Sequence, residues 1–410
     1  MPDPRLPHRL RDSTLWVSTL LAASVACTEE APTGDTGVLD DAIAICAFGV
    51  APDSLTGFLD TVPSIDEGTT DTSTVVDLGS NPHCASAFGA VYVAVFDSNV
   101  VTRYERDAEG RLAETGRVSF QPAGLTSLTG TSRSFVFLSE TDALYVDRVS
   151  GLVVRWNPTD MTVTSFFEIP GLLVEGEQAS LQPVLGGPVD GELLVYGRFV
   201  GGGLLLPRSV LVRLDLETEE ATVDVDDRCG GLISDVRASD GATYIASAPL
   251  VSVYDETNLN EDSPCILRVG AGENAFDREF FVDPRDLVDD NLAGSLLDIG
   301  GDSALVLGFD RTIRDPANFL TPNVWASAES WVAYRIDDIK TPLPGTRVEG
   351  LPPQTGQVNQ MLTLGDQNYL LRVASDLSSS TLQNVTDLED VRDGLRFEGG
   401  VVVDVLPLDE

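Results

Sequence analysis

Basic residues other than arginine are scarce in this chain of 410 residues. Lys340 is the only lysine, and histidine occurs only at His8 and His83. Acidic residues number 65 against 26 lysines and arginines, which gives a formal net charge of −39. Such a charge repels the phosphate backbone of nucleic acids unless a local basic patch offsets it, and the sequence holds no such patch. We therefore expect no nucleic-acid partner.

The common catalytic and metal-binding motifs are also missing. A Ser-His-Asp triad would have to use His83, and no Gly-x-Ser-x-Gly motif accompanies it. The glycines at 201–203 lack the Lys-Ser/Thr pair of a phosphate-binding loop. Neither a Cys-x-x-Cys pair nor an Asp-x-Asp-x-Asp-Gly calcium loop occurs. The sequence thus assigns no catalytic residue and no metal ligand, and we expect no cofactor, with calcium in one or two loops as the alternative.

The N-terminus has the order of charges and apolar residues that is typical of an exported protein. Three arginines precede an apolar run at 15–26, which is too short to span a bilayer and is followed by Cys27. We interpret residues 1–26 as a lipoprotein signal peptide and Cys27 as the lipidated first residue of the mature chain. An ordinary signal peptide cut near Ala26 is the alternative.

Residues 27–41 are polar, acidic and rich in glycine, a composition that predicts a flexible tether. No apolar run long enough to cross a membrane follows. By resemblance to bacterial lipoproteins, Thr28 favours sorting to the outer membrane. We therefore expect a chain held in the cell envelope, at the outer membrane, through its acyl chains, with residues 42–410 forming the folded domain.

The four remaining cysteines are an even number in an exported chain, which favours two disulfides. We favour pairing Cys46 with Cys84 and Cys229 with Cys265, because each pair has the separation expected of neighbouring strands or adjacent repeats. The other pairings, or free buried thiols, are the alternatives.

A strand-like step with a central arginine recurs about every sixty residues. Each step is followed by a turn rich in glycine, asparagine, aspartate or proline, and then by another strand-like run. The six arginines are Arg103, Arg155, Arg213, Arg268, Arg335 and Arg396. A spacing this regular indicates a structural repeat.

A short apolar run precedes each arginine and predicts a strand buried on both faces. A further unit with a strand at 42–48 would precede the six, giving seven. No segment keeps a helical apolar period for long. Seven β units over one domain predict an all-β fold, a seven-bladed β-propeller closed by pairing 42–48 with 401–406. Six or eight blades, or two tandem β-sandwiches, are the alternatives.

The recurring arginines have two interpretations. We favour a structural role, in which the stem covers apolar surface while the guanidinium meets water or a loop carboxylate. The alternative is a ring of arginines that binds anions.

The longest interruption of the repeat, at 307–332, combines cationic and aromatic residues in an otherwise acidic chain. One interpretation is that this insertion binds an anionic or aromatic small molecule through paired hydrogen bonds and stacking. The interpretation we favour is that the tryptophans belong to the core and close one end of the ring. The candidate ligand-binding residues are Arg311, Arg314, Phe319, Trp325 and Trp331.

Together with the signal-like start, three segments, 57–68, 90–105 and 144–158, resemble the propeller-type lipoproteins of myxobacteria and their relatives. Some of these are associated with siderophore gene clusters. The resemblance implies capture or handling of a ferric chelate at the outer membrane, and it carries over no catalytic residue. A more distant resemblance to metal-dependent lactonase propellers implies inward carboxylates and an asparagine around a channel cation, none of which we assign.

The sequence thus predicts a lipid-anchored β-propeller that binds or scaffolds rather than catalyses. We expect a monomer whose partner is an anionic small molecule or an outer-membrane protein. A divalent-metal-dependent hydrolase of lactonase type and a purely structural surface lipoprotein are the alternatives.

Overall fold

The computed structural model describes residues 43–51, 54–70, 75–172, 176–259, 263–289, 291–315, 321–356 and 360–408. The predicted signal peptide, Cys27 and the tether lie outside these ranges. Within them, no helix has the length and apolar character needed to cross a membrane.

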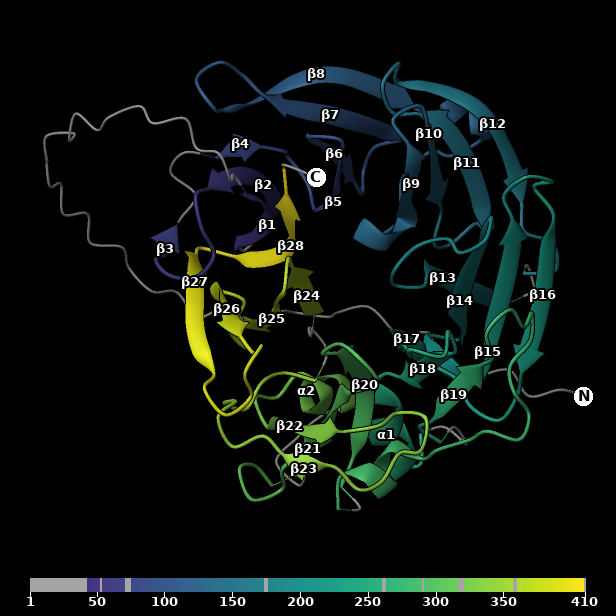
Figure 1. Cartoon of the computed structure of the whole chain (residues 1–410), viewed down its shortest axis with the longest axis vertical. Helices are drawn as coiled ribbons and strands as arrows, with labels where there is room; N and C mark the ends of the chain where they lie inside the picture. The colour runs from purple at the N-terminus through teal and green to yellow at the C-terminus, as the bar shows by residue number, and fades with distance from the viewer. Residues whose placement is uncertain are drawn as a thin grey trace, which may run out of the picture.

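Seven β-sheets surround a central axis and form a ring, with the chain running once around it (Figure 1). This is the predicted seven-bladed β-propeller. The innermost strands are β5 (Pro82–Ala87), β9 (Phe135–Ser139), β13 (Glu177–Pro183), β17 (Leu232–Arg237), β20 (Ala293–Asp298), β24 (Gln360–Leu364) and β28 (Val401–Pro407). The second strands are β6 (Ala90–Val95), β10 (Asp142–Val146), β14 (Glu192–Gly201), β18 (Thr243–Ser247), β21 (Ala304–Phe309), β25 (Gln367–Val373) and β1 (Ile43–Ala51).

The outer half of each blade is less regular. The third strands are β7 (Val100–Arg106), β11 (Leu152–Asn157), β15 (Leu204–Asp215), β19 (Ile266–Val269), β22 (Trp331–Ile336), β26 (Ser379–Asn384) and β2 (Ser54–Val62). The fourth strands are β8 (Leu112–Ser119), β12 (Thr162–Glu168), β16 (Ala221–Asp226), β23 (Thr346–Arg347), β27 (Arg392–Glu398) and β4 (Val76–Asp77). The short β3 (Thr69–Thr70) adds in parallel to β27.

The apolar runs predicted from the sequence are the second strands of their blades. Every residue of β18 and β21 is buried, because neighbouring blades cover both faces of each sheet at this distance from the axis. The innermost strands are more polar, since one of their edges meets the central channel. The core is therefore a series of apolar layers between blades.

The ring is closed by an antiparallel pairing between the two ends of the folded chain. β1 pairs with β28 from Ile43 opposite Pro407 to Phe48 opposite Val401, which confirms the predicted closure. The C-terminal strand is the innermost strand of this blade, and the rest of the sheet comes from the N-terminal part. Figure 1 shows β28 beside β1.

Both predicted disulfides are present. Cys46 and Cys84 join β1 to the innermost strand of the next blade, with Cα atoms 6.2 Å apart. Cys229 and Cys265 join the start and the third strand of one blade, with Cα atoms 6.1 Å apart.

Antiparallel strands place successive connections on alternate faces of the ring. The face of the ring that carries the connections between second and third strands, together with the connections between blades, is called the upper face. The lower face carries the remaining turns. The helices α1 (Pro249–Glu256) and α2 (Pro322–Ala326) are insertions on the upper face and contact each other. Short 3-10 helices occur in connections between blades: η1 (Gln121–Ala123), η2 (Ser132–Ser134) and η3 (Pro284–Leu287).

Five of the six recurring arginines occupy equivalent third strands, whereas Arg396 lies on the fourth strand β27. The predicted equivalence of Arg396 is therefore wrong. The third strand of this blade, β26, is largely polar and lies between the apolar run and the arginine. The repeat pattern matched Arg396 because of its flanking residues in the sequence. It therefore assigned the arginine to the third strand, although it lies on the fourth.

Three of the recurring arginines tie their blade to the next. A terminal nitrogen (Nη1) of Arg103 donates to the carbonyl oxygen of Thr159 at 3.2 Å. Arg155 Nη1 donates in the same way to Leu216 at 3.0 Å, and Arg213 Nη1 to Glu273 at 2.7 Å. Each acceptor lies in the turn that follows the third strand of the next blade. These three contacts repeat from blade to blade, whereas Arg268 and Arg335 pair with Asp277 and Asp337, loop carboxylates of their own blades, as the structural interpretation expects.

Removing one of these ties should destabilise the ring. Arg155 also forms an ion pair with Asp142 at 2.7 Å and is three-quarters buried. We expect Arg155→Gln to lower the free energy of unfolding by about 1–3 kcal/mol in urea titration, because a half-buried carboxylate and a carbonyl lose their donor. The control Arg392→Gln, whose exposed ion pair is local, should change it by less than about 0.5 kcal/mol. Equal losses in the two variants would contradict the interblade role.

Candidate functional site

A buried polar network connects three successive blades beside the channel. Arg133 in η2 pairs with Asp235 on β17, with Nη1 and Oδ1 2.6 Å apart. The Tyr196 hydroxyl on β14 donates to the same carboxylate oxygen at 2.9 Å and accepts from Gln182 Nε2 at 2.7 Å. The amide of Leu185 donates to the other carboxylate oxygen at 2.7 Å. One carboxylate thus accepts from donors on two neighbouring blades, and the network joins three blades in all.

The charges in this network are balanced internally. Asp235 has no exposed surface, and the Arg133 guanidinium compensates its charge. Burial, together with the nearby carboxylate, raises the pKa of Tyr196 well above its usual value. Burial opposes the charge on Arg133, but Asp235 and Tyr196 together outweigh it and raise the pKa of Arg133. The tyrosine therefore stays a donor and the arginine stays cationic at physiological pH.

A cavity of about 520 Å³ lies among the turns at 240–242 and 270–277, and a cavity of about 690 Å³ lies against the fourth strands β8 and β12. A cavity of about 460 Å³ differs, because it opens beside the channel toward the lower face. Its walls include three phenylalanines, Phe88, Phe135 and Phe137. Arg133 and the connection 183–188 complete them. Aromatic walls with one cationic group suit a small molecule that has an apolar or aromatic body and a negative charge.

Two local backbone features shape the cavity. Gly186 and Gly187 have φ angles of +81° and +68°, which let the β13–β14 connection turn back toward the channel. Phe88, in the turn after β5, has a φ of +54° and remains 40% exposed. A bulky residue in this left-handed region is strained by about 1 kcal/mol or more. The fold thus keeps an aromatic ring at the rim in an unfavourable conformation.

The insertion that the sequence singled out lies on the upper face, between β21 and β22. Trp325 and Trp331 are buried, and both rings pack edge-on against Phe309 with centroids 5.6 and 5.4 Å apart. These two tryptophans belong to the core, as the interpretation without a ligand expects. Arg311 is exposed and donates to Glu256 at 3.1 Å.

The predicted ligand-binding set is therefore only partly gathered. Arg314 is exposed on the same connection as Arg311, and Phe319 lies outside the described residues. None of the four described members of the set lines the cavity beside the channel. Ligand binding by the insertion remains a prediction.

His83 lies in the core between two blades. Its Nε2 is 3.2 Å from the hydroxyl of Tyr145, and burial lowers the pKa of His83 to about 4. Phe96 and Phe135 pack around its ring. It is a neutral core residue, consistent with the absence of triad motifs.

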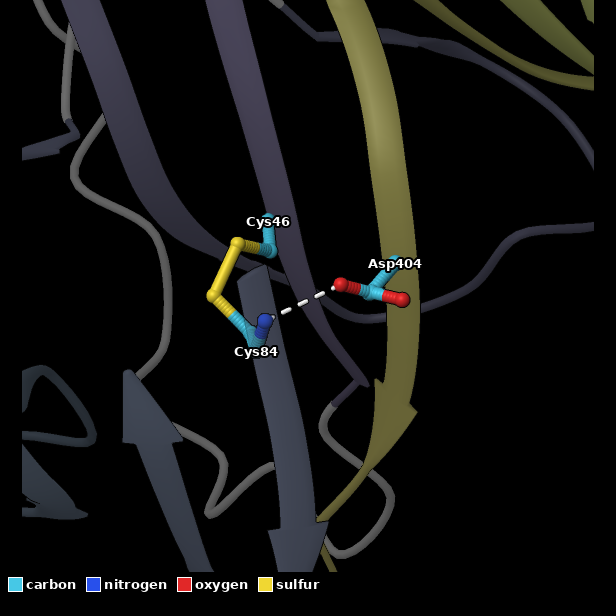
Figure 2. A group of neighbouring side chains, drawn as sticks. All are labelled: Cys46, Cys84 and Asp404. Carbon is cyan, nitrogen blue, oxygen red and sulfur yellow. Dashed lines mark hydrogen bonds between the residues drawn. A yellow bond between two sulfur atoms is a disulfide. The ribbon is translucent and has the colours of Figure 1, made fainter. Parts of the chain in front are cut away.

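One group of three potential metal-ligating side chains occurs in the part of the chain that the structure describes: Cys46, Cys84 and Asp404. Figure 2 shows that the two sulfur atoms are joined in the disulfide, with the carboxylate beside them. A disulfide sulfur is not a thiolate ligand, so Asp404 is the only ionisable donor left. These residues do not fit a metal ion.

Asp404 is instead a buried carboxyl at the closing blade. It lies on β28 opposite Cys46 and accepts from the amide of Cys84 at 3.0 Å (Figure 2). Burial raises the pKa of Asp404 to about 7, although hydrogen bonds from Ser132, Cys84 and Gln360 oppose this shift. The carboxyl thus changes charge near neutral pH.

No protein-family model and no curated protein sequence matches the chain. Solved structures do resemble it. A Bacteroides fragilis protein assigned as a 6-phosphogluconolactonase is 12% identical, with a TM-score of 0.51 over 91% of this chain and 99% of its own. A Bacteroides uniformis protein with the same assignment is 11% identical, with a TM-score of 0.51 over 90% and 99%. A Lactobacillus plantarum protein is 14% identical, with a TM-score of 0.52 over 90% and 99%.

These likenesses agree with the sheet topology and define the class of protein, a β-propeller. At such low identity they establish the fold and carry no residue role. The network of Arg133 and Asp235 was missed by sequence reasoning. Its one visible signal is an isolated acid inside the apolar strand 232–237, where a buried charge requires a partner.

Replacing Asp404 tests the buried carboxyl at the ring closure. Its pKa is raised in the folded state, so its contribution to stability is complete at low pH and is lost as the pH rises through about 7. Asp404→Asn should therefore gain stability relative to the wild type between about pH 5 and pH 8, by on the order of 2 kcal/mol in urea titration. The exposed control Asp337→Asn should show no such gain, and a pH-independent difference for Asp404→Asn would contradict the assignment.

Proposed function

We propose that this protein is a lipid-anchored, extracytoplasmic β-propeller that binds an anionic small molecule in the cavity beside its channel. The observation that carries the proposal is the combination of Phe88, Phe135, Phe137 and Arg133 around one hollow of about 460 Å³. The chain otherwise carries a large excess of negative charge, so a cationic group in an aromatic hollow is selective for a particular kind of ligand.

Arg133 is suited to this role because its position is fixed before a ligand arrives. Among the described residues, its hydrogen bonds to Asp235 and Tyr196 both use Nη1, which leaves its other nitrogens for a ligand. A planar guanidinium held in place pairs with a carboxylate or phenolate at little further loss of entropy. The phenylalanine rings would receive the apolar part of the same molecule.

The cellular setting of the proposal comes from the sequence. The apolar run at 15–26 and Cys27 support export and lipidation, and a lipid anchor supplies membrane attachment without a transmembrane helix. The resemblance to propeller lipoproteins of siderophore clusters suggests a ferric chelate as the ligand, handled at the outer membrane with a membrane protein as partner. Ferric complexes of catechol-type chelators combine negative charge with aromatic rings, the chemistry that the cavity offers.

Lactone hydrolysis is a second candidate function. It is supported by the two Bacteroides propellers assigned as 6-phosphogluconolactonases, which match about nine-tenths of this chain in fold. A phosphorylated sugar lactone carries the negative charge that Arg133 would bind. No described residue is assigned a catalytic role in this reaction.

Binding measurements on cavity variants distinguish these ideas. Titration of the full mature chain with ferric 2,3-dihydroxybenzoate should quench its tryptophan fluorescence, and Phe135→Ala and Arg133→Gln should each weaken binding about tenfold or more. Arg133→Gln leaves the buried Asp235 carboxylate without its ion-pair partner. The double variant Arg133→Gln/Asp235→Asn removes both charges and is therefore measured beside it. The matched control Arg311→Gln removes one charge from the upper face and should bind normally.

Two results would reject the cavity as the site. Loss of binding in Arg311→Gln with normal binding in the cavity variants would place the ligand at the insertion. Turnover of 6-phosphogluconolactone without binding of the ferric complex would favour the second candidate.

The lipid anchor is tested separately. Expression of the full chain in a bacterial host with labelled palmitate should give a labelled protein in the membrane fraction. Cys27→Ser should remove the label and release the protein to the soluble envelope fraction. A wild-type protein that is exported without label would contradict lipidation at Cys27.

A further inference from the structure

A second feature beside the channel is a pair of arginines without a compensating acid. Arg148 follows β10 in the connection to β11, on the upper face. Its carbonyl oxygen accepts from the amide of Leu181 at 2.8 Å, so its backbone lies along the free, channel-side edge of β13. Its Nε donates to the hydroxyl of Ser180 at 2.7 Å. The guanidinium of Arg148 is thus fixed against β13.

Arg198 lies beside this contact. It is directly opposite Ser180 in the ladder between β13 and β14. Side chains of residues opposite one another in an antiparallel pair point to the same face, with Cβ atoms about 5 Å apart. Arg198 therefore lies on the same sheet face as Ser180, and the charge of Arg148 acts on it, which places the two arginines close together.

The two charges are not neutralised by the protein. Among the described residues, neither Arg148 nor Arg198 forms an ion pair or a hydrogen bond with a carboxylate, whereas Arg133, a short distance along the same channel wall, is paired with Asp235. Burial lowers the pKa of Arg148, and burial followed by the charge of Arg148 lowers the pKa of Arg198 to about 10. Both stay cationic at neutral pH. Two like charges held together with reduced solvation destabilise the empty site.

We propose that Arg148, Ser180 and Arg198 form a binding site for a doubly charged oxyanion, with a phosphoryl group as the fitting ligand. Two planar guanidiniums supply two positive charges and several donors in a fixed orientation. The Ser180 oxygen accepts from Arg148, so its own proton remains available to an anion. A single carboxylate would neutralise only one of the two arginines.

This site differs from the cavity toward the lower face. Ser180 lies two residues before Gln182 on β13, and Arg198 lies two residues after Tyr196 on β14. Both pairs are on the same sheet face, and the pair of Ser180 and Arg198 is nearer the upper face of the ring. None of the three proposed ligand groups lines the cavity. The proposal therefore does not depend on the cavity binding a ligand, and a cavity variant such as Phe135→Ala should leave it intact.

Thermal unfolding and calorimetry with inorganic phosphate test the proposal on the full mature chain. At about pH 7.5, where phosphate is mostly a dianion, and at constant ionic strength, saturating phosphate should raise the wild-type Tm by several degrees. Sulfate should act similarly. Arg148→Gln and Arg198→Gln should each abolish the rise. The matched control Arg392→Gln, which makes the same change of charge at an exposed, local ion pair, should keep it.

A second readout separates an anion site from a purely structural role. Without phosphate, Arg198→Gln should unfold at the same temperature as the wild type or higher, because it removes repulsion from Arg148. A structural arginine would instead lower the Tm. Should a glutamine variant fail to fold, Arg198→Lys keeps the charge but loses the planar donors and should bind phosphate about tenfold more weakly.

Three outcomes would overturn the proposal. The first is that phosphate does not raise the Tm of the wild type. The second is that phosphate raises the Tm of both glutamine variants as much as that of the wild type. The third is that Arg198→Gln has a clearly lower Tm than the wild type without phosphate. Binding of malonate without phosphate or sulfate would also reject the phosphoryl assignment, in favour of a dicarboxylate.

Discussion

The pairing of β28 with β1 is the contact on which the rest of the ring depends. A single blade exposes two apolar faces, and only neighbours on both sides bury them. By placing the last strand of the chain innermost in a sheet that otherwise comes from the N-terminal part, this pairing leaves no blade with an open face. The Cys46–Cys84 disulfide then fixes the closing blade to the next one. The closure thus sets the geometry of the channel.

A closed ring explains where polar chemistry occurs in this molecule. Second strands are buried on both faces and hold apolar side chains, whereas the innermost strands have an edge that faces the channel. Groups from separate blades meet there: Arg133 comes from one blade, Tyr196 from the next and Asp235 from the one after. One arginine is neutralised by an acid, while Arg148 and Arg198 are not. Arg133 therefore belongs to a network whose charges balance, whereas Arg148 and Arg198 form a site that an anion would neutralise.

The sequence was sufficient for the architecture because burial on both faces leaves a continuous apolar signature, repeated seven times. It misplaced Arg396, because the preceding strand β26 is polar and did not register as a strand. It also missed the channel groups. Arg133 and Asp235 are separated by 102 residues, and nothing local in either segment indicates that they meet. Aromatic residues drew attention to the insertion, yet Trp325 and Trp331 are there for packing.

Hydrogen exchange tests the dependence on ring closure most directly. If the β28–β1 pairing holds the ring, the backbone amides of β1 and β28 should exchange as slowly as those of buried second strands such as β14 and β18, and all should become exposed in one cooperative step. Rapid exchange in β1 and β28 while the other six sheets remain protected would contradict it, because the channel would then persist without its closure.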